Sequence, residues 1–163
     1  MKTRTLLALS TLLVLSLSGC GQKDAAAPAA AAPAASAGPR VIEITAGDTM
    51  KYSLAAIEAK PGEDLKIVLT NNGSLPKEAM GHNWVLLKKD SDGAAFASAA
   101  VAAKATDYIP ANLADQVLAH IETLGPRKSG EVAFKAPTEP GDYPFLCSFP
   151  GHYALMKGVL TVK

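Results

Sequence analysis

The sequence predicts an all-β fold for residues 41–163, an antiparallel sandwich or barrel closed around one core. Apolar and polar side chains alternate there in short segments that are rich in β-branched and aromatic residues, which is the pattern of half-buried strands. Pro-Gly and Asn-Gly pairs separate these segments at the points where the chain should reverse. The length of this part, about 123 of 163 residues, is enough for a single domain with its own core.

The alternation places each strand and each turn in order along the chain. Strands are expected at residues 41–45, 64–72, 82–87, 130–134, 143–147 and 158–162. The turn pairs are Pro61-Gly62, Asn72-Gly73, Pro140-Gly141 and Pro150-Gly151. Many short strands with turns between them are typical of sandwiches and barrels rather than of α/β folds.

One region departs from this alternation. Residues 92–107 are dense in alanine, which favours a helix, and Asp92 is suited to cap its first turn. Residues 113–125 fit two structures, because their apolar residues recur with helical spacing while the VLAHI stretch within them alternates like a strand. We therefore expect a short helical insertion and leave residues 113–125 open between helix and strand.

The first 19 residues have the features of an export signal. Lys2 and Arg4 precede an apolar stretch at residues 6–17 that is too short to cross a bilayer comfortably, and small residues follow. The Leu-Ser-Gly-Cys sequence ending at Cys20 resembles a bacterial lipobox, in which the signal is cut before the cysteine and the cysteine is lipidated. The alternative is an ordinary signal with a chance cysteine. The lipobox predicts an exported protein anchored by lipid at the periplasmic face of a membrane.

Residues 20–40 are expected to be a tether. They consist mainly of alanine and proline, so they have little to bury, and the prolines interrupt any helix. Without Lys2 and Arg4 of the signal, 14 of the 16 basic residues remain against 15 acidic ones. A nearly neutral chain argues against a nucleic-acid partner and against a polybasic membrane patch.

The motif that carries chemistry is CSFPGHYALM at residues 147–156. Cys147 ends one predicted strand and Met156 precedes the next, so a hairpin loop brings Cys147, His152 and Met156 together. Thiolate and thioether sulfur prefer copper or another soft metal, imidazole suits copper and zinc, and the loop has no carboxylate for calcium or magnesium. A lipidated Cys20 would also leave Cys147 without a disulfide partner in an oxidising compartment. Copper is the expected metal.

A blue-copper centre needs a second histidine, because it combines two His and one Cys with a long, weak Met. His82 begins a predicted strand, where a rigid sheet would hold it against the loop. His120 has no soft neighbour and is expected to lie outside the site. Taken singly, Cys147 and Met156 are better explained as core residues. Their occurrence together with two histidines favours the metal site.

GHNWVL at residues 81–86 and CSFPGHYALMKGVLTVK at residues 147–163 closely resemble the azurins, a family of cupredoxins. Both the four-residue gap from Cys to His and the three-residue gap from His to Met match that family. The resemblance covers residues 41–163, and the alanine-rich residues 92–107 lie where azurins carry a helical flap. It implies a Greek-key β-sandwich of about eight strands with one type 1 copper ion at one end.

The resemblance also implies the role of each ligand. His82, Cys147 and His152 would be the equatorial ligands of the copper ion. Met156 would be an axial ligand, and the Gly81 carbonyl would be a weak contact on the opposite side. Such a set leaves no open equatorial position for a substrate, unlike a catalytic metal site. An electron-transfer protein, and not an enzyme, is therefore expected.

Further residues around the copper ion are assigned by the same resemblance. Asn83 would tie the two ligand segments together, and the backbone amides of Asn83 and Phe149 would point at the thiolate sulfur and tune its redox potential. Electrons would leave through the ring of His152, at an apolar patch. The matching patch positions are Met50, Leu75, Pro76, Met80, Phe149 and Pro150. Brief encounters with c-type cytochromes or copper oxidoreductases would take place there.

The sequence departs from the azurins at two points. The two cysteines that form a disulfide near the start of azurins are missing. Tyr153 replaces a small hydroxyl residue, which leaves undecided whether the partner-docking surface of the family is kept.

Three other functions are compatible with parts of the sequence. Copper storage or delivery is the main alternative, although such sites are usually open and rich in Met or His. An enzyme with Cys147 as nucleophile and His152 as base lacks a third, orienting residue. A copper reductase domain would need more histidines.

Overall fold

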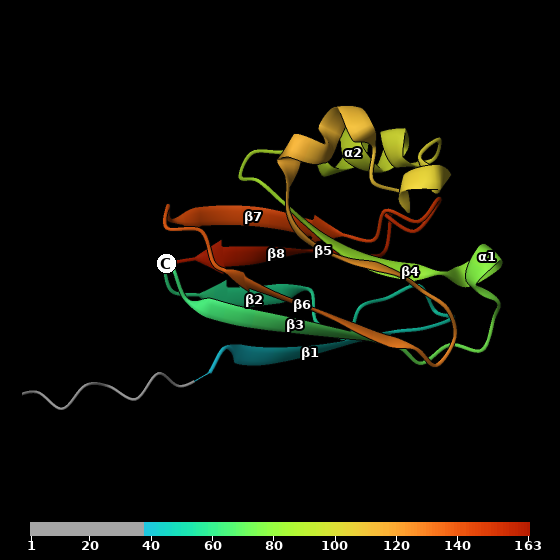
Figure 1. Cartoon of the computed structure of the whole chain (residues 1–163), viewed down its shortest axis with the longest axis horizontal. Helices are drawn as coiled ribbons and strands as arrows, with labels where there is room; N and C mark the ends of the chain where they lie inside the picture. The colour runs from blue at the N-terminus through green and yellow to red at the C-terminus, as the bar shows by residue number, and fades with distance from the viewer. Residues whose placement is uncertain (1–37) are drawn as a thin grey trace, which may run out of the picture. The chain divides into compact units, whose positions relative to one another are not determined.

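The computed structural model describes residues 38–163, which form a sandwich of two β-sheets (Figure 1). The three-stranded sheet has the order β1 (Arg40–Ala46), β3 (Asp64–Asn71), β6 (Ser129–Lys135). The five-stranded sheet has the order β2 (Ala56–Ala59), β8 (Lys157–Val162), β7 (Gly141–Leu146), β4 (His82–Leu87), β5 (Val117–Leu124). The eight strands confirm the predicted all-β sandwich. The expected signal peptide, Cys20 and most of the tether lie outside the described residues.

The main core forms between the sheets from the inward-facing side chains of both. In β3, Leu65, Ile67 and Leu69 are completely buried, whereas the residues between them are half-exposed. This period-two pattern follows from the pleat, which turns successive side chains to opposite faces. The alternation in the sequence therefore predicts which face of each strand meets the core.

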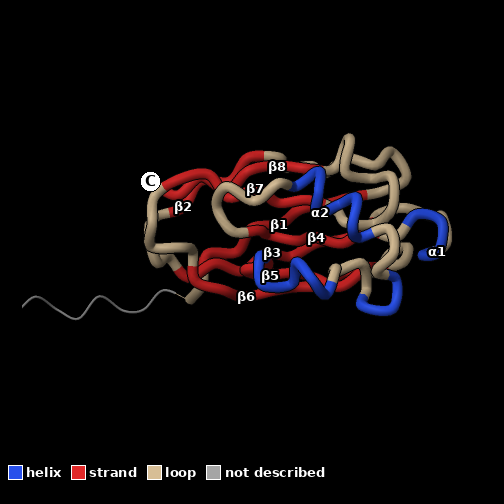
Figure 2. The backbone as a smooth tube through the Cα atoms, turned by 90° about the horizontal axis from the view of Figure 1, so that it is seen from above, coloured by secondary structure: helices blue, strands red, loops and turns tan. Residues whose placement is uncertain are grey.

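β4 is the exception, because every one of its residues is buried. Trp84 and Leu86 face the main core, while Val85 and Leu87 pack with Phe96 in a second, smaller cluster. Phe96 belongs to α2 (Gly93–Ala100), which covers the outer face of the five-stranded sheet (Figure 2). A strand covered on both faces cannot move without disturbing two cores. β4 is therefore a rigid support for His82, its first residue.

The helical insertion is shorter than predicted. Asp92 caps α2 as expected, accepting hydrogen bonds from the backbone N–H groups of Ala94 and Ala95 at 2.9 and 3.0 Å. The helix ends at Ala100, and two 3₁₀ segments, Lys104–Thr106 and Ala111–Gln116, follow instead of its continuation to 107. Asp107 and Tyr108, which lie between them, adopt left-handed backbone conformations that no α-helix contains.

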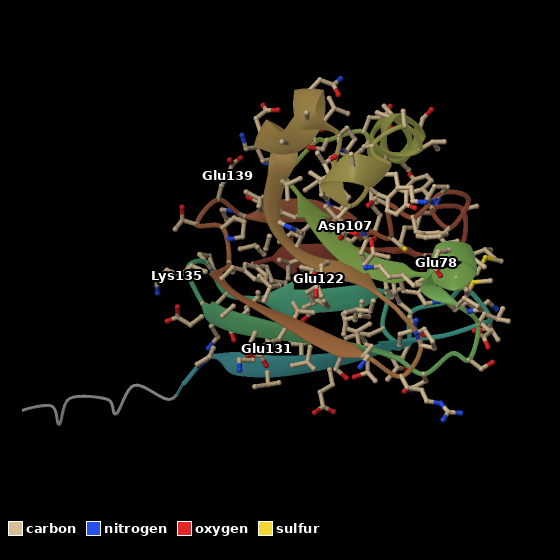
Figure 3. The ribbon with its side chains drawn as sticks, turned by 45° about the vertical axis from the view of Figure 1, so that its right-hand side comes forward. Glu78, Asp107, Glu122, Glu131, Lys135 and Glu139 are labelled. Atoms are coloured by element: carbon tan, nitrogen blue, oxygen red, sulfur yellow. The ribbon has the colours of Figure 1, made fainter. Side chains whose placement is uncertain are left out.

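Asp107, labelled in Figure 3, connects the insertion to the sheet. Its carboxylate accepts a hydrogen bond from the backbone N–H of Thr123 in β5 at 2.6 Å. Most of the ambiguous residues 113–125 form β5, because pairing with β4 satisfies their backbone groups over Val117–Leu124. Tertiary pairing thus decided what periodicity left open.

The expectation of purely antiparallel strands is wrong for two pairs. β1 runs parallel to β3, and β2 runs parallel to β8. The chain leaves β1 to form β2 in the other sheet before it returns as β3, so β1 and β3 are joined by a crossover rather than by a hairpin. No strand was expected at β2, because its four residues, AIEA, are few and include only one β-branched side chain.

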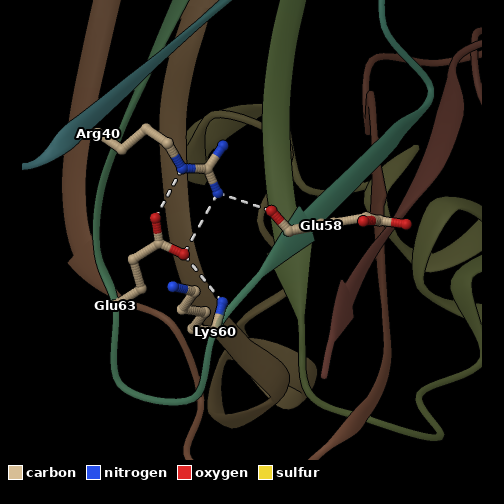
Figure 4. Close-up of polar contacts among 4 residues, drawn as sticks. All are labelled: Arg40, Glu58, Lys60 and Glu63. Carbon is tan, nitrogen blue, oxygen red and sulfur yellow. Dashed lines mark hydrogen bonds and ion pairs between the residues drawn. The ribbon is translucent and has the colours of Figure 1, made fainter.

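The chain enters the domain at the end opposite the loop that joins β7 to β8 (Figure 1). Arg40, the first residue of β1, binds Glu63 through an ion pair of 2.6 Å and donates to the Glu58 carbonyl at 2.6 Å (Figure 4). Lys163, the last residue, bonds Ala59 through its backbone N–H at 3.0 Å. Both ends of the domain are therefore fixed at this end of the sandwich. Within the described residues, no helix is long and apolar enough to span a membrane.

Gly158→Ala is predicted to destabilise the domain. A Cβ at this position in β8 would overlap the Phe145 ring and the Ala55 carbonyl oxygen. We expect the free energy of unfolding, measured by urea denaturation, to fall by about 1–3 kcal/mol, the usual range for overpacking a core. Gly38→Ala is the control, because no atom lies within 4 Å of a Cβ there. Equal stability of the two variants would contradict the packing described here.

Candidate metal centre

Three elements bring the predicted ligands together at one end of the sandwich. His82 is the first residue of β4, Cys147 follows the last residue of β7, and His152 and Met156 lie in the loop that leads to β8. The backbone N–H of Cys147 donates to the Met156 carbonyl at 2.9 Å, which closes the base of the loop. The backbone N–H of Met156 donates to the His152 carbonyl at 2.9 Å, so the loop turns back over its own base.

The ligand atoms of His82, Cys147 and His152 all lie within 4.8 Å of one another. The Cys147 sulfur is 3.7 Å from Nδ1 of His152, and the two imidazole ring centres are 5.0 Å apart. The exposed fractions of the three residues are 0%, 0% and 3%. His120 lies apart from them as an exposed residue of β5, as the sequence predicted. The arrangement is a compact, dry set of two nitrogen ligands and one sulfur ligand.

The imidazoles of this set are suited to a cation. Both ring nitrogens of His82 are buried without a hydrogen-bond partner, and such groups cost about 1–3 kcal/mol each when nothing compensates them. Burial, followed by the charge of His82, lowers the pKa of His152 to about 4. Burial also lowers the pKa of His82; the Gly47 carbonyl, near the ring but outside hydrogen-bond geometry, partly offsets the shift. Both rings are therefore neutral at pH 7, with free lone pairs.

The thiol responds to burial in the opposite direction. Burial raises the pKa of Cys147 to about 11, while the backbone N–H groups of Asn83 and Phe149 act to lower it. The Tyr52 hydroxyl also lies near the sulfur, but it donates its one proton to the Asn83 carbonyl. Without a metal the sulfur therefore keeps its proton at pH 7. A soft cation replaces that proton and binds the thiolate, so metal binding at this site releases a proton. These residues fit copper, whose ligands are thiolate and imidazole.

Asn83 connects the two segments that carry the ligands. Its side-chain oxygen accepts from the backbone N–H of Ser148 at 2.8 Å, and its side-chain amide donates to the Ser148 hydroxyl at 2.7 Å. Since Asn83 follows His82 and Ser148 follows Cys147, the pair fixes the distance between two ligands. Sequence reasoning named Asn83 but missed Ser148, although a hydroxyl next to the cysteine was a usable signal.

Gly81 is required by close packing in front of His82. A Cβ there would lie 2.5 Å from the Thr123 methyl group, 2.7 Å from the Lys77 carbonyl oxygen and 3.1 Å from the Phe149 ring. Gly81 also ends α1 (Lys77–Met80), which covers this end of the sandwich. The absence of a side chain lets the backbone before His82 lie directly against β5 and the ligand loop.

The predicted patch residues surround this end of the domain. Leu75 and Pro76 are exposed, Met50, Met80 and Pro150 are half-buried, and Phe149 is buried against His152 with ring centres 4.7 Å apart. Tyr153 takes a different direction from the patch: it packs beside Leu146 and Gly93 of α2, with the Lys157 ammonium 4.7 Å from its ring centre. Tyr153 therefore attaches the ligand loop to the helical insertion.

Comparison with known proteins agrees with this geometry. Residues 40–163 match the profile of the copper-binding proteins of the plastocyanin/azurin family. This chain belongs to that family. Azurin of Bordetella pertussis is 40% identical over 124 residues, which are 74% of this chain and 82% of that protein. Outer membrane protein H.8 of Neisseria meningitidis is 32% identical over 179 aligned positions, which cover 96% of this chain and 97% of that protein.

Solved structures of copper proteins have the same fold as this chain. The blue copper protein auracyanin A of Chloroflexus aurantiacus superposes with a TM-score of 0.69 at 32% identity, covering 77% of this chain and all of that one. Family membership and the His82, Cys147, His152 cluster together identify a type 1 copper electron-transfer protein. When bound, copper would supply a one-electron couple, and the buried residues His82, Cys147 and His152 would hold it away from water.

The buried imidazoles predict how the copper-free protein responds to pH. The folded-state pKa of His152 lies near 4 and its ordinary value is 6.5, so the unfolded chain takes up the proton first. The free energy of unfolding should therefore fall as the pH is lowered from about 6.5 to about 4. Urea denaturation at a series of pH values measures this slope. His152→Gln should flatten it, whereas His120→Ala, which removes an exposed imidazole, should not. If the free energy of unfolding changed equally with pH in the parent and in His152→Gln, the lowered pKa of His152 would be refuted.

Proposed function

We propose that this protein passes single electrons between exported redox proteins, with its copper ion cycling between Cu(II) and Cu(I). The observation that carries the proposal is the closed ligand set: three donor atoms within 4.8 Å, on residues that are at most 3% exposed. A site of this kind has no room for a substrate at the metal, but it holds the same ligands in place in both oxidation states. Because the ligands are held rigidly, they rearrange little when an electron is transferred.

We propose Met156 and the Gly81 carbonyl as the weak axial contacts. Met156 is completely buried, and its backbone is bonded to both Cys147 and His152, so its side chain belongs to the same rigid loop. A thioether is a weak donor to Cu(II) and favours the reduced ion. Gly81 has a close-packed backbone next to His82, which restricts where its carbonyl group can lie.

The route for electrons in this proposal leads through His152 to the patch of Met50, Leu75, Pro76, Met80, Phe149 and Pro150. His152 is nearly buried, and the aromatic ring of Phe149 lies against it, so a partner that covers the patch comes close to the copper ligand. An apolar patch rimmed by polar residues suits a brief, low-affinity encounter. Candidate partners are c-type cytochromes and copper oxidoreductases.

Copper storage or delivery is the alternative that these contacts disfavour. A delivery site must open to pass its ion to a receiver, whereas His82 lies on a strand covered on both faces and the ligand loop is closed by the Cys147 to Met156 hydrogen bond. Release of copper from such a site requires local unfolding. Rapid exchange is therefore not expected.

We further propose that lipidated Cys20 anchors the protein at the periplasmic face of a membrane. The alignment with the Neisseria outer membrane protein covers 96% of this chain, which includes most of the tether. Residues 21–39 would reach at most roughly 60–70 Å when fully extended. Bacterial lipoproteins usually carry two or three acyl chains, and more than one chain makes anchoring stable. Confinement would raise the local concentration of membrane-bound partners.

The copper site itself is tested by colour. The purified domain, given Cu(II), should turn intensely blue, because the Cys147 thiolate donates charge to the metal. Cys147→Ser should abolish the colour, since a hydroxyl is a poor substitute for a thiolate. Met156→Leu should stay blue and have a higher reduction potential, because a weak electron donor is removed. A pale parent complex would refute the blue-copper assignment, and loss of copper from Met156→Leu would show that Met156 is a primary ligand. His120→Ala should match the parent.

The anchor is tested separately with Cys20→Ala in a bacterial host. The parent should stay with the membrane fraction after a high-salt wash, because acyl chains and not charges hold it there. The variant should be released into the soluble periplasmic fraction or remain an unprocessed precursor. Parent protein found soluble with its signal removed would disprove the anchor. The copper assignment does not depend on the outcome, since every ligand lies after residue 80.

A further inference from the structure

Tyr52 reaches the copper site from a part of the chain that contains no ligand. It lies in the loop between β1 and β2, 31 residues before Asn83, and its hydroxyl donates a hydrogen bond to the Asn83 carbonyl. Its ring packs on Phe145 with ring centres 5.9 Å apart. The side chain is half-buried, with its hydroxyl end turned inside.

The loop that carries Tyr52 is held in place independently of the ligands. The backbone N–H of Met50 donates to the Gly47 carbonyl at 2.9 Å, which forms a turn. Ser53 is bonded twice to Thr45, through its backbone N–H and through its hydroxyl oxygen, each at 2.9 Å. Tyr52 lies between these two anchors, so its position is set by β1 and by its own loop.

Asn83 is held from three directions as a result. Its side chain makes two hydrogen bonds to Ser148, and its carbonyl accepts the Tyr52 hydroxyl. Its backbone N–H is one of the groups that act to lower the pKa of the Cys147 thiol, which places it near the sulfur. Rotation of the backbone at Asn83 would turn its N–H away from the sulfur. Such a rotation would also break the hydrogen bond between the Tyr52 hydroxyl and the Asn83 carbonyl.

We propose that the Tyr52 hydroxyl is a positioning group for the copper thiolate, which acts by holding Asn83 so that its amide remains directed at the Cys147 sulfur. The inference rests on the copper centre described above. Hydrogen bonds to a thiolate draw electron density from the sulfur, weaken its donation to Cu(II) and raise the reduction potential. Tyr52 would thus set the potential without touching the metal.

The surroundings of the hydroxyl keep it a donor. Burial raises the pKa of Tyr52 well above its ordinary value, and the nearby Cys147 raises it further. The hydroxyl is therefore protonated at neutral pH and can donate to the Asn83 carbonyl.

Tyr52→Phe tests this positioning role, because it removes the hydroxyl and keeps the ring on Phe145. Tyr143→Phe is the matched control: Tyr143 is also a buried tyrosine, and its hydroxyl donates to a backbone carbonyl, that of Glu139, at 2.8 Å. Glu139 lies at the end of the domain opposite Glu78 of α1, far from the copper site (Figure 3). Both variants lose one hydrogen bond of the same kind, so they should lose similar stability.

We expect the Tyr52→Phe protein to have a lower reduction potential than the parent and a shifted blue absorption band, with the Tyr143→Phe protein unchanged in both. In the copper-free proteins, hydrogen exchange of the Asn83 amide, followed by NMR, should be faster in Tyr52→Phe alone. A potential, band and Asn83 exchange rate equal to those of the parent would overturn the inference. Equal shifts in both variants would also overturn it, as a general effect of destabilisation. A parent protein that is not blue would instead refute the copper centre.

Discussion

The double hydrogen bond between Asn83 and Ser148 is the interaction on which the site depends. It joins the beginning of β4 to the loop after β7, two parts of the chain that are 65 residues apart, and each partner follows a copper ligand. Both groups are buried, so breaking either bond would leave polar atoms without water to replace the partner. The separation of His82 and Cys147 is therefore set by the fold before any metal binds.

Burial gives this preformed site its chemistry. The same removal from water that lowers the pKa of both histidines raises the pKa of the thiol, so the empty site is neutral and its His82 nitrogens lack partners. Copper would be the partner of one nitrogen of each imidazole and would replace the thiol proton. Binding of this kind stabilises the folded state, because the unfolded chain has no comparable site. That contribution matters in a domain whose described residues contain no disulfide.

The support for the site is divided between two cores. The main core between the sheets holds Cys147 and Met156, while the smaller cluster under α2 packs behind β4 and receives Tyr153 from the ligand loop. Asp107 fixes the insertion to β5, and β5 in turn packs against Gly81 through Thr123. Through Asp107 and Tyr153, the insertion therefore supports the copper end of the domain.

Local patterns in the sequence determined the strands with clean alternation, the cap at Asp92 and the ligand loop, because pleat, capping and short-range spacing act between neighbours along the chain. The match of both gaps in residues 147–156 to a known family then indicated copper. Tertiary structure alone decided the rest. It made β2 a strand by pairing it with β8, settled residues 117–124 by pairing them with β4, and placed Tyr52 and Ser148 at Asn83. These outcomes depend on partners 30 or more residues away, which no local pattern encodes.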